Sequence, residues 1–269
     1  MTLSTVFLTA DAAFALVSGG LLYFLPHIFA DILFQRKSDG VHWHLVRCIG
    51  GQIAASSFVA FRFRKSSNVV KSVCHLLRII PTIILLVLIY QCQSQTENLI
   101  PTNILKGAKI LMYSSLAVNF LLLSVNKWIT GSRLLESMPF GNFLYQMDAL
   151  ASICIGAAWI TFPKWLLHRQ VLVDLDESHE LCGRVMGVLF ISSYVVSTHA
   201  LYWESQRDRK VAVDGRVVCC VAILVAQLWS QTYDAWSGNH WIGITLFSTW
   251  TVLALLYRVG LQFIKTKTK

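Results

Sequence analysis

Long apolar runs separated by short polar connections make up most of the chain. A helix needs roughly 20 mainly apolar residues to cross the hydrocarbon of a bilayer, and eight runs are about that long. They cover Thr5–Leu25, Leu45–Phe61, Val73–Cys92, Gly107–Asn126, Phe143–Pro163, Leu181–Leu201, Arg216–Tyr233 and Trp241–Gly260. Membrane β-strands would alternate polar and apolar residues, which these runs do not. The pattern predicts an all-α, polytopic bundle of eight transmembrane helices.

Composition agrees with a membrane protein. Of the 269 residues, 55% are hydrophobic and only 14% are charged, whereas soluble domains average about 45–50% and about 25%. This apolar excess is too large for one soluble core, and it excludes a disordered chain. The seven cysteines form no CxxC pair, which argues against a disulfide scaffold or a metal-binding cysteine motif.

The net charge of +9 is distributed unevenly between alternate connections. One set contains Arg62, Arg64, Lys65, Lys71, Lys127, Arg133, Arg207, Arg209, Lys210, Lys265, Lys267 and Lys269. The other set contains only Arg36, Lys37, Lys106, Lys164 and Arg169. The positive-inside rule then predicts that both termini are cytosolic. This alternation explains the basic charge without a nucleic-acid partner. It also makes Arg62, Arg64 and Lys65 candidates for contact with anionic lipid headgroups.

A shift of 137 residues aligns the start of the chain with its second half. The matches are Asp11 with Asp148, Ala12 with Ala149, Gly19 with Gly156, Pro26 with Pro163, Asp39 with Asp176, His42 with His179, Arg47 with Arg184, Gly50 with Gly187, Ser56 with Ser193, and Val59 with Val196. Arg78 and Arg216 also lie near corresponding span starts, at a shift of 138. We therefore predict two tandem four-helix units, residues 1–130 and 140–264, followed by a basic cytosolic tail, 265–269. Because four is even, both units would enter the membrane in the same direction.

Asp11 and Asp148 lie inside apolar runs. A charge at the centre of a bilayer costs about 2.5–3.5 kcal/mol on insertion scales, so such a residue normally has a partner or a function. One interpretation is proton or cation handling. The other is pairing with an intramembrane arginine, for which Arg47 and Arg184 are candidates despite a difference in depth. These two arginines could instead reach lipid headgroup phosphates.

The motif Asp-x-x-His occurs twice, as Asp39–His42 and Asp176–His179. Aspartate and histidine can ligate transition metals, but two ligands in each connection do not complete a site. We therefore expect residues that cap the following helices, with Asp176 or Ser178 at the start of the sixth span. No metal and no cofactor is predicted.

Glycines recur at matched positions, namely Gly19, Gly50, Gly156 and Gly187. Small residues let membrane helices approach closely. We expect them to serve helix packing, with a groove for a lipid tail as the alternative.

Lys267 and Lys265 occupy the third and fifth places from the end, a spacing similar to the dilysine retrieval signal of endoplasmic-reticulum membrane proteins. Nucleophile-elbow, phosphate-loop and zinc-helix motifs are missing from the sequence. The predicted function is a non-enzymatic scaffold or accessory subunit of a membrane complex in the endoplasmic reticulum. Its partners would be membrane lipids, which it could handle, and another protein. The alternatives are a small transporter or channel that uses Asp11 and Asp148, and an integral-membrane enzyme.

Overall fold

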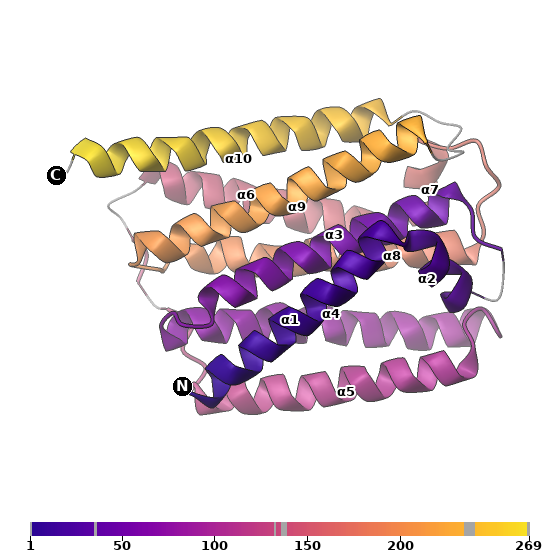
Figure 1. Ribbon diagram of the computed structural model, residues 1–269, viewed down its shortest axis with the longest axis horizontal. Coiled ribbons are helices and arrows are strands. Elements are labelled where there is room, and N and C mark those ends of the chain that lie inside the picture. The colour runs from indigo at the N-terminus through magenta and orange to yellow at the C-terminus, as the bar shows by residue number, and fades with distance from the viewer. Residues whose placement is uncertain (1, 35–36, 132, 136–138, 234–239, 268–269) are drawn as a thin grey trace.

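The computed structural model describes residues 2–34, 37–131, 133–135, 139–233 and 240–267, with side chains described as far as residue 261. Ten helices occur in these ranges, and they confirm the all-α prediction (Figure 1). They are α1 (Leu3–Phe24), α2 (Pro26–Leu33), α3 (Gly40–Phe63), α4 (Asn68–Gln95), α5 (Thr102–Val125), α6 (Pro139–Thr161), α7 (Pro163–His168), α8 (Glu177–Ala200), α9 (Gln206–Thr232) and α10 (Trp241–Lys267).

The long helices lie side by side along one axis, while α2 and α7 sit at one end of the bundle (Figure 1). Each short helix begins with a proline at its first position, where the missing N–H costs nothing. The helix α1 begins and α10 ends at the opposite end of the bundle from α2 and α7 (Figure 1). Every predicted span overlaps one long helix, and among the described helices only α2 and α7 were not predicted.

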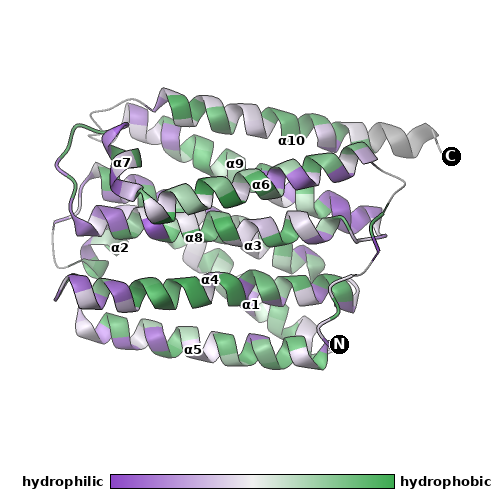
Figure 2. Ribbon diagram, turned by 180° about the vertical axis from the view of Figure 1, so that it is seen from behind, coloured by the Kyte–Doolittle hydropathy of each residue, from purple (hydrophilic) through white to green (hydrophobic). Residues whose placement is uncertain are grey.

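Seven described helices are long and apolar enough to cross a membrane: α1, α4, α5, α6, α8, α9 and α10. The chain is therefore a membrane protein with several candidate spans. The outer helices expose large apolar side chains, including Phe14 at 62% and Val17 at 63% on α1. Figure 2 shows hydrophobic residues along much of α4.

The helix α3 is as long as its neighbours but is not among the seven. It packs against α1, α2, α4, α8 and α9, so most of its surface meets protein. Its buried residues include His42, His44, Arg47 and Gln52, which lower its average hydropathy. A helix enclosed by other helices needs no continuous apolar surface, which explains its composition. The count of eight spans stays a prediction.

Contacts between helices follow the same order in the two halves of the chain. The helix α1 packs along α3, as α6 packs along α8, and α4 lies beside α5, as α9 lies beside α10. The halves also interlock, because α3 packs on α9 and α4 packs on α8. One connected core therefore includes residues from both halves, such as Val41, Leu45, Phe190 and Ile223.

The recurring glycines lie where helices approach most closely. A Cβ atom built on Gly19 would be 2.8 Å from the Gly50 carbonyl oxygen, and one built on Gly50 would be 2.6 Å from the Gly19 oxygen. The second half repeats this contact: a Cβ on Gly156 would be 2.6 Å from the Gly187 oxygen. Backbone meets backbone at both positions, which confirms the predicted role in helix packing.

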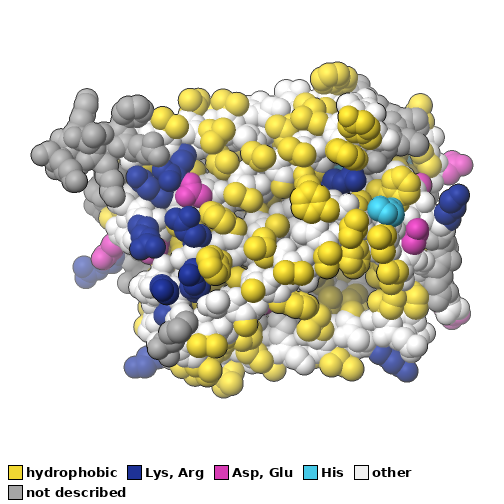
Figure 3. Space-filling model, in the orientation of Figure 1, with side chains coloured by type: hydrophobic (Ala, Val, Ile, Leu, Met, Phe, Trp, Pro, Cys, Tyr) yellow, Lys and Arg dark blue, Asp and Glu magenta, His cyan; other side chains and the backbone are white. Residues whose placement is uncertain are grey.

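Basic side chains gather at the end of the bundle where α1 begins (Figure 3). Lys65 and Arg207 are exposed there. Two members of the predicted basic set are buried instead. Lys71 is 6% exposed, and Arg209 is fully buried, donating to the Ala200 carbonyl oxygen at 3.0 Å and to Asn142 Oδ1 at 2.8 Å. These two cations act inside the protein, not on a lipid surface.

The predicted tail begins within α10, whose helix continues to Lys267, so Lys265 and Lys267 are helical while their side chains lie outside the described part.

Candidate functional site

Asp148 of α6 forms an ion pair with Arg216 of α9 inside the bundle. The Nε and Nη2 atoms of Arg216 lie 2.7 and 2.9 Å from the two carboxylate oxygens. Only 8% of the Arg216 side chain and 15% of the Asp148 side chain is exposed. A guanidinium and a carboxylate that meet through two contacts form a strong, geometrically defined pair.

Further polar groups complete this pair. The Trp250 indole Nε1 donates to Asp148 at 2.9 Å, and the Ser197 hydroxyl donates to the same carboxylate. Arg216 also donates to Ser152 at 2.8 Å, and its guanidinium lies 4.9 Å from the centre of the Trp250 ring. A buried ion pair is stable only when its remaining polar atoms are hydrogen-bonded, and here most of them are.

Asp11 of α1 has an equivalent partner in the first half. Arg78 Nε of α4 lies 2.8 Å from Asp11 Oδ2, and Arg78 Nη1 donates to Ser56 at 3.1 Å. Arg216 similarly contacts Ser193, at 3.2 Å. The two pairs are thus built from the same residue types on corresponding helices.

The sequence named Arg47 and Arg184 as candidate partners, whereas the structure pairs the carboxylates with Arg78 and Arg216. Helix direction explains the difference. The helices α1 and α4 begin at the same end of the bundle (Figure 1), so Asp11 and Arg78 reach a similar depth. Because α3 begins at the opposite end, Arg47 lies at another depth. The sequence analysis marked Arg78 only as a repeat match near a span start, whereas α4 begins earlier, at Asn68, and places Arg78 deeper in the helix.

Arg47 and Arg184 contact protein instead. Arg47 is 9% exposed, donates to the Tyr23 carbonyl oxygen at 3.2 Å, and lies 5.4 Å from the centre of the Trp229 ring. Little of its surface remains for a lipid headgroup. Arg184 is more exposed, at 23% of its side chain, and pairs with Glu180 at 3.4 Å.

A cavity of about 270 Å³ lies beside the Asp148–Arg216 pair, between α6 and α10. Its walls are mainly apolar and include Leu144, Ala151 and Leu253, while α9 closes its base. Met147 and Leu253, which also line it, are 47% and 56% exposed. The cavity therefore opens on the apolar outer face of the helices and has a polar floor.

A smaller cavity of about 60 Å³ lies between α3, α4, α8 and α9, where the two halves meet. It is lined by Arg78 and Arg216 and by the matched Ser56 and Ser193. Gln52 also lines it, is 5% exposed, and has neither amide atom hydrogen-bonded. The centre of the bundle is therefore polar but narrow.

The two Asp-x-x-His motifs form the first turns of α3 and α8. Asp39 accepts hydrogen bonds from the backbone N–H groups of Val41 and His42, at 2.9 and 3.1 Å. Asp176 accepts from those of Ser178 and His179, at 3.0 and 3.3 Å. In both motifs the histidine ring reaches back to the N-cap residue and closes a capping box. The predicted capping role is confirmed for both motifs.

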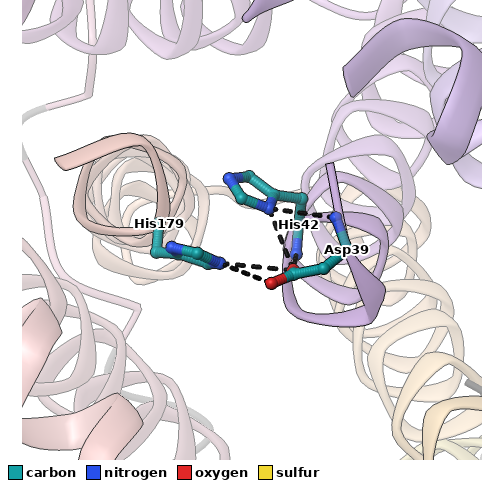
Figure 4. Close-up of side chains that lie close together, drawn as sticks. All are labelled: Asp39, His42 and His179. Atoms are coloured by element: carbon teal, nitrogen blue, oxygen red, sulfur yellow. Dashed lines mark hydrogen bonds and ion pairs between the residues drawn. The ribbon is translucent and has the colours of Figure 1, made fainter. Parts of the chain in front are cut away.

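The structure also brings the two motifs together, which spacing within either one could not predict. His179 Nε2 lies 3.1 Å from Asp39 Oδ2, and the rings of His42 and His179 are 3.8 Å apart (Figure 4). His42 Nε2 lies 2.7 Å from Ser178 Oγ. Burial disfavours the Asp39 carboxylate, but hydrogen bonds from His179 and His42 outweigh burial and lower the pKa of Asp39. In the part of the chain that the structure describes, Asp39, His42 and His179 form one group of potential metal ligands.

The long apolar helices and the two buried Asp–Arg pairs between them define an all-α, multi-pass membrane protein. The family described as "Domain of unknown function (DUF8292)" matches residues 9–259, and the chain belongs to this family. No curated protein and no solved structure matches the chain.

Proposed function

We propose that the protein is a non-enzymatic, multi-pass membrane protein of the endoplasmic reticulum that binds an amphiphile and serves a larger membrane complex. The observation that carries this proposal is the apolar cavity of about 270 Å³ with the Asp148–Arg216 pair in its floor. Ligand pockets for small molecules are typically apolar with a few placed polar groups, and about 300–1,000 Å³ in volume. The cavity is slightly smaller than this range, so it suits one acyl chain or ring system, not a whole phospholipid.

The two ends of the cavity suit the two ends of an amphiphile. Leu144, Ala151 and Leu253 would contact its apolar body, and the exposed rim gives access from the bilayer. At the floor, Arg216 and Asp148 offer a guanidinium and a carboxylate beside the Trp250 indole. A hydroxyl, amide or phosphate group could join this hydrogen-bonded set.

Polar side chains occupy the corresponding place in the first half. At the shift that relates Arg78 to Arg216, His75 corresponds to Val213, which lines the cavity. His75 is fully buried and bridges Ser4 and Asn119, at 3.0 and 2.9 Å. In the first half, polar side chains therefore hydrogen-bond to one another at this place. In the second half, apolar side chains at the corresponding place leave a cavity. The proposal therefore assigns ligand binding to the second half alone.

We also propose that the chain consists of two tandem units with four spans each. Corresponding helix contacts, paired Asp–Arg residues, His-based capping boxes and glycine contacts support it. The helix α3 serves as the eighth span, since α1 begins and α10 ends at the same end of the bundle (Figure 1), which requires an even number of crossings. The basic residues at that end support cytosolic termini.

Labelling of single cysteines in a cysteine-free background tests this orientation. Lys65 and Leu172 are exposed at opposite ends of the bundle, and Leu172 is 86% exposed. In sealed microsomes, an impermeant thiol reagent should label Lys65→Cys from the cytosolic side and Leu172→Cys only after the membrane is opened. The reverse order would contradict the proposed topology.

Filling the cavity tests amphiphile binding. Ala151 lines the cavity, whereas Ala157 lies on the same helix, is exposed and is outside it. Mild-detergent purification followed by mass spectrometry should recover a bound amphiphile from the wild type and from Ala157→Phe, but not from Ala151→Phe. Equal recovery from all three would contradict the proposal. Stoichiometric recovery of another protein in the same preparation would support the accessory role, and recovery of the chain alone would count against it.

Transport is the second candidate, and the polar cavity between the halves favours it. Arg78, Arg216 and Gln52 line a space of about 60 Å³, which exceeds the roughly 10–15 Å³ that a single water needs. If the intramembrane carboxylates carry protons or cations, the double variant Asp11→Asn with Asp148→Asn should abolish the flux of these ions in proteoliposomes. Unchanged flux in this double variant would remove the two carboxylates from any transport mechanism.

A further inference from the structure

We propose that Asp39, His42 and His179 form a zinc site that joins the two halves at the end of the bundle opposite the chain termini. The site goes beyond the proposed amphiphile binding, since it lies at the starts of α3 and α8, away from the cavity between α6 and α10. Two imidazoles and one carboxylate are a donor set that Zn²⁺ accepts, commonly with water in the fourth position.

Distances between the ligand atoms fit a single ion. His42 Nδ1 lies 2.9 Å from Asp39 Oδ1, and His179 Nε2 lies 3.1 Å from Asp39 Oδ2 (Figure 4). One atom from each of the three residues lies within 4.8 Å of the others. Tetrahedral ligands at about 2.0–2.1 Å from zinc are about 3.3 Å apart. To hold one ion, the rings of His42 and His179, whose centres lie 3.8 Å apart, would turn away from each other.

The far side of each histidine is also held as a metal ligand requires. Metal-bound histidine usually donates its second ring N–H to a carboxylate or another acceptor, which fixes the ring and raises its basicity. His179 Nδ1 lies 2.8 Å from Asp176 Oδ1, and His42 Nε2 lies 2.7 Å from Ser178 Oγ. Each ring thus has one nitrogen near the site and the other near a supporting oxygen, and metal binding would replace the contacts of the two Nδ1 atoms with the backbone N–H groups of Asp39 and Asp176.

Burial and charge favour an ion at this position. The histidines are 2% and 4% exposed, so their orientation is fixed by packing, while the Asp39 side chain is 38% exposed and leaves a path for the ion. Asp39 and Asp176 bring two negative charges close to the two imidazole rings. A divalent cation would neutralise both carboxylates and would link the segment before α3 to the segment before α8.

Metal content of the purified full-length protein tests the site. After treatment with a chelator, exposure to Zn²⁺ and removal of free metal, we expect about one zinc per chain by elemental mass spectrometry. Cobalt in place of zinc should give the visible absorption of a low-symmetry Co²⁺ site with nitrogen and oxygen ligands. Mg²⁺ and Ca²⁺ should not compete, because they prefer all-oxygen sites. A wild-type protein without stoichiometric zinc and without the cobalt band would overturn the proposal.

Conservative variants separate metal binding from folding. Asp39→Asn keeps a good N-cap for α3 but removes the ligand charge, so zinc affinity should fall strongly while the protein still elutes as a folded species. Asp176→Asn keeps the cap of α8, and loss of the supporting carboxylate should weaken zinc binding about 10–100-fold. His179→Ala should abolish stoichiometric binding.

His27 provides the matched control. It lies on α2 at the same end of the bundle and is exposed, so His27→Ala should leave zinc content and the cobalt spectrum unchanged. Equal zinc binding in wild type, Asp39→Asn and His179→Ala would show that the metal sits elsewhere. A loss of zinc in His27→Ala as large as that in His179→Ala would also show that the metal sits elsewhere.

Discussion

Adding one methyl group at Gly19 should destabilise the bundle, whereas adding it at Gly20 should not. The Cβ of Gly19→Ala would lie 2.8 Å from the Gly50 carbonyl oxygen and 2.9 Å from the Ala54 nitrogen. Ordinary contacts of this kind are 3.4–4 Å, and both neighbours are backbone atoms that cannot rotate away. The helices α1 and α3 must separate to make room. The Cβ of Gly20→Ala meets nothing within 4 Å.

Comparison with Gly20→Ala isolates the cost of the close contact at Gly19. Both substitutions change helix propensity and unfolded-chain entropy by the same amount, so these contributions cancel in the comparison. What remains is overpacking at one closely packed contact, which typically costs about 1–3 kcal/mol. We therefore expect the free energy of unfolding of Gly19→Ala to be lower than that of Gly20→Ala by about this amount.

Thermal unfolding in mild detergent, followed by loss of the monodisperse size-exclusion peak, would measure the difference. Each kcal/mol corresponds to roughly 2–4 °C for domains of 150–250 residues, so a gap of several degrees is expected. Equal melting temperatures for the two variants would refute the close approach of α1 and α3. Gly156→Ala should behave like Gly19→Ala, since its Cβ would lie 2.5 Å from Ile191 Cγ1 and 2.6 Å from the Gly187 oxygen.

Two further predictions concern buried cations. Arg216→Met should lower the free energy of unfolding by about 3–5 kcal/mol because it leaves Asp148 without its partner, and adding Asp148→Leu should restore most of this loss. A double variant no more stable than the single one would contradict this account of the pair. Arg209→Ala should cost roughly 1–3 kcal/mol for each oxygen acceptor left unpaired, whereas the exposed Arg207→Ala should stay within about 0.5 kcal/mol. Similar effects of the last two variants in a thermal unfolding assay would mean that Arg209 is not buried.

Hydropathy and motif spacing predicted where the long helices lie in the sequence, but not which helices pack against one another. Apolar runs located the eight long helices of the described residues, including α3, because apolar composition is a local property of the sequence. The helix ends were less well placed. The helix α9 begins at Gln206, earlier than the span predicted from Arg216, because its first turns are polar and buried by other helices.

The partners of the intramembrane carboxylates depended on helix direction and depth. Asp11 and Asp148 stand out in apolar sequence, and repeat matching marked Arg78 and Arg216, but a local pattern cannot show which arginine reaches the same depth. The contribution of Trp250 from the last helix was also not predicted, since a tryptophan in an apolar run has no distinctive local pattern.

The meeting of His179 with Asp39 is a similar case. Each Asp-x-x-His motif shows its capping role locally, through backbone N–H groups two and three residues away. Contact between the motifs arises from packing of α3 on α8, which joins residues 140 positions apart. Only the three-dimensional arrangement brings three potential ligands together.

Photochemical labelling in native membranes tests the central claim, amphiphile binding between α6 and α10, most directly. A photoactivatable fatty acid is added, activated by light, and the labelled peptides are identified by mass spectrometry. The account predicts labelling centred on Met147 and Leu253, which is lost in Ala151→Phe and retained in Ala157→Phe. Labelling spread evenly over the exposed faces of α1, α5 and α6, and unchanged in Ala151→Phe, would contradict it.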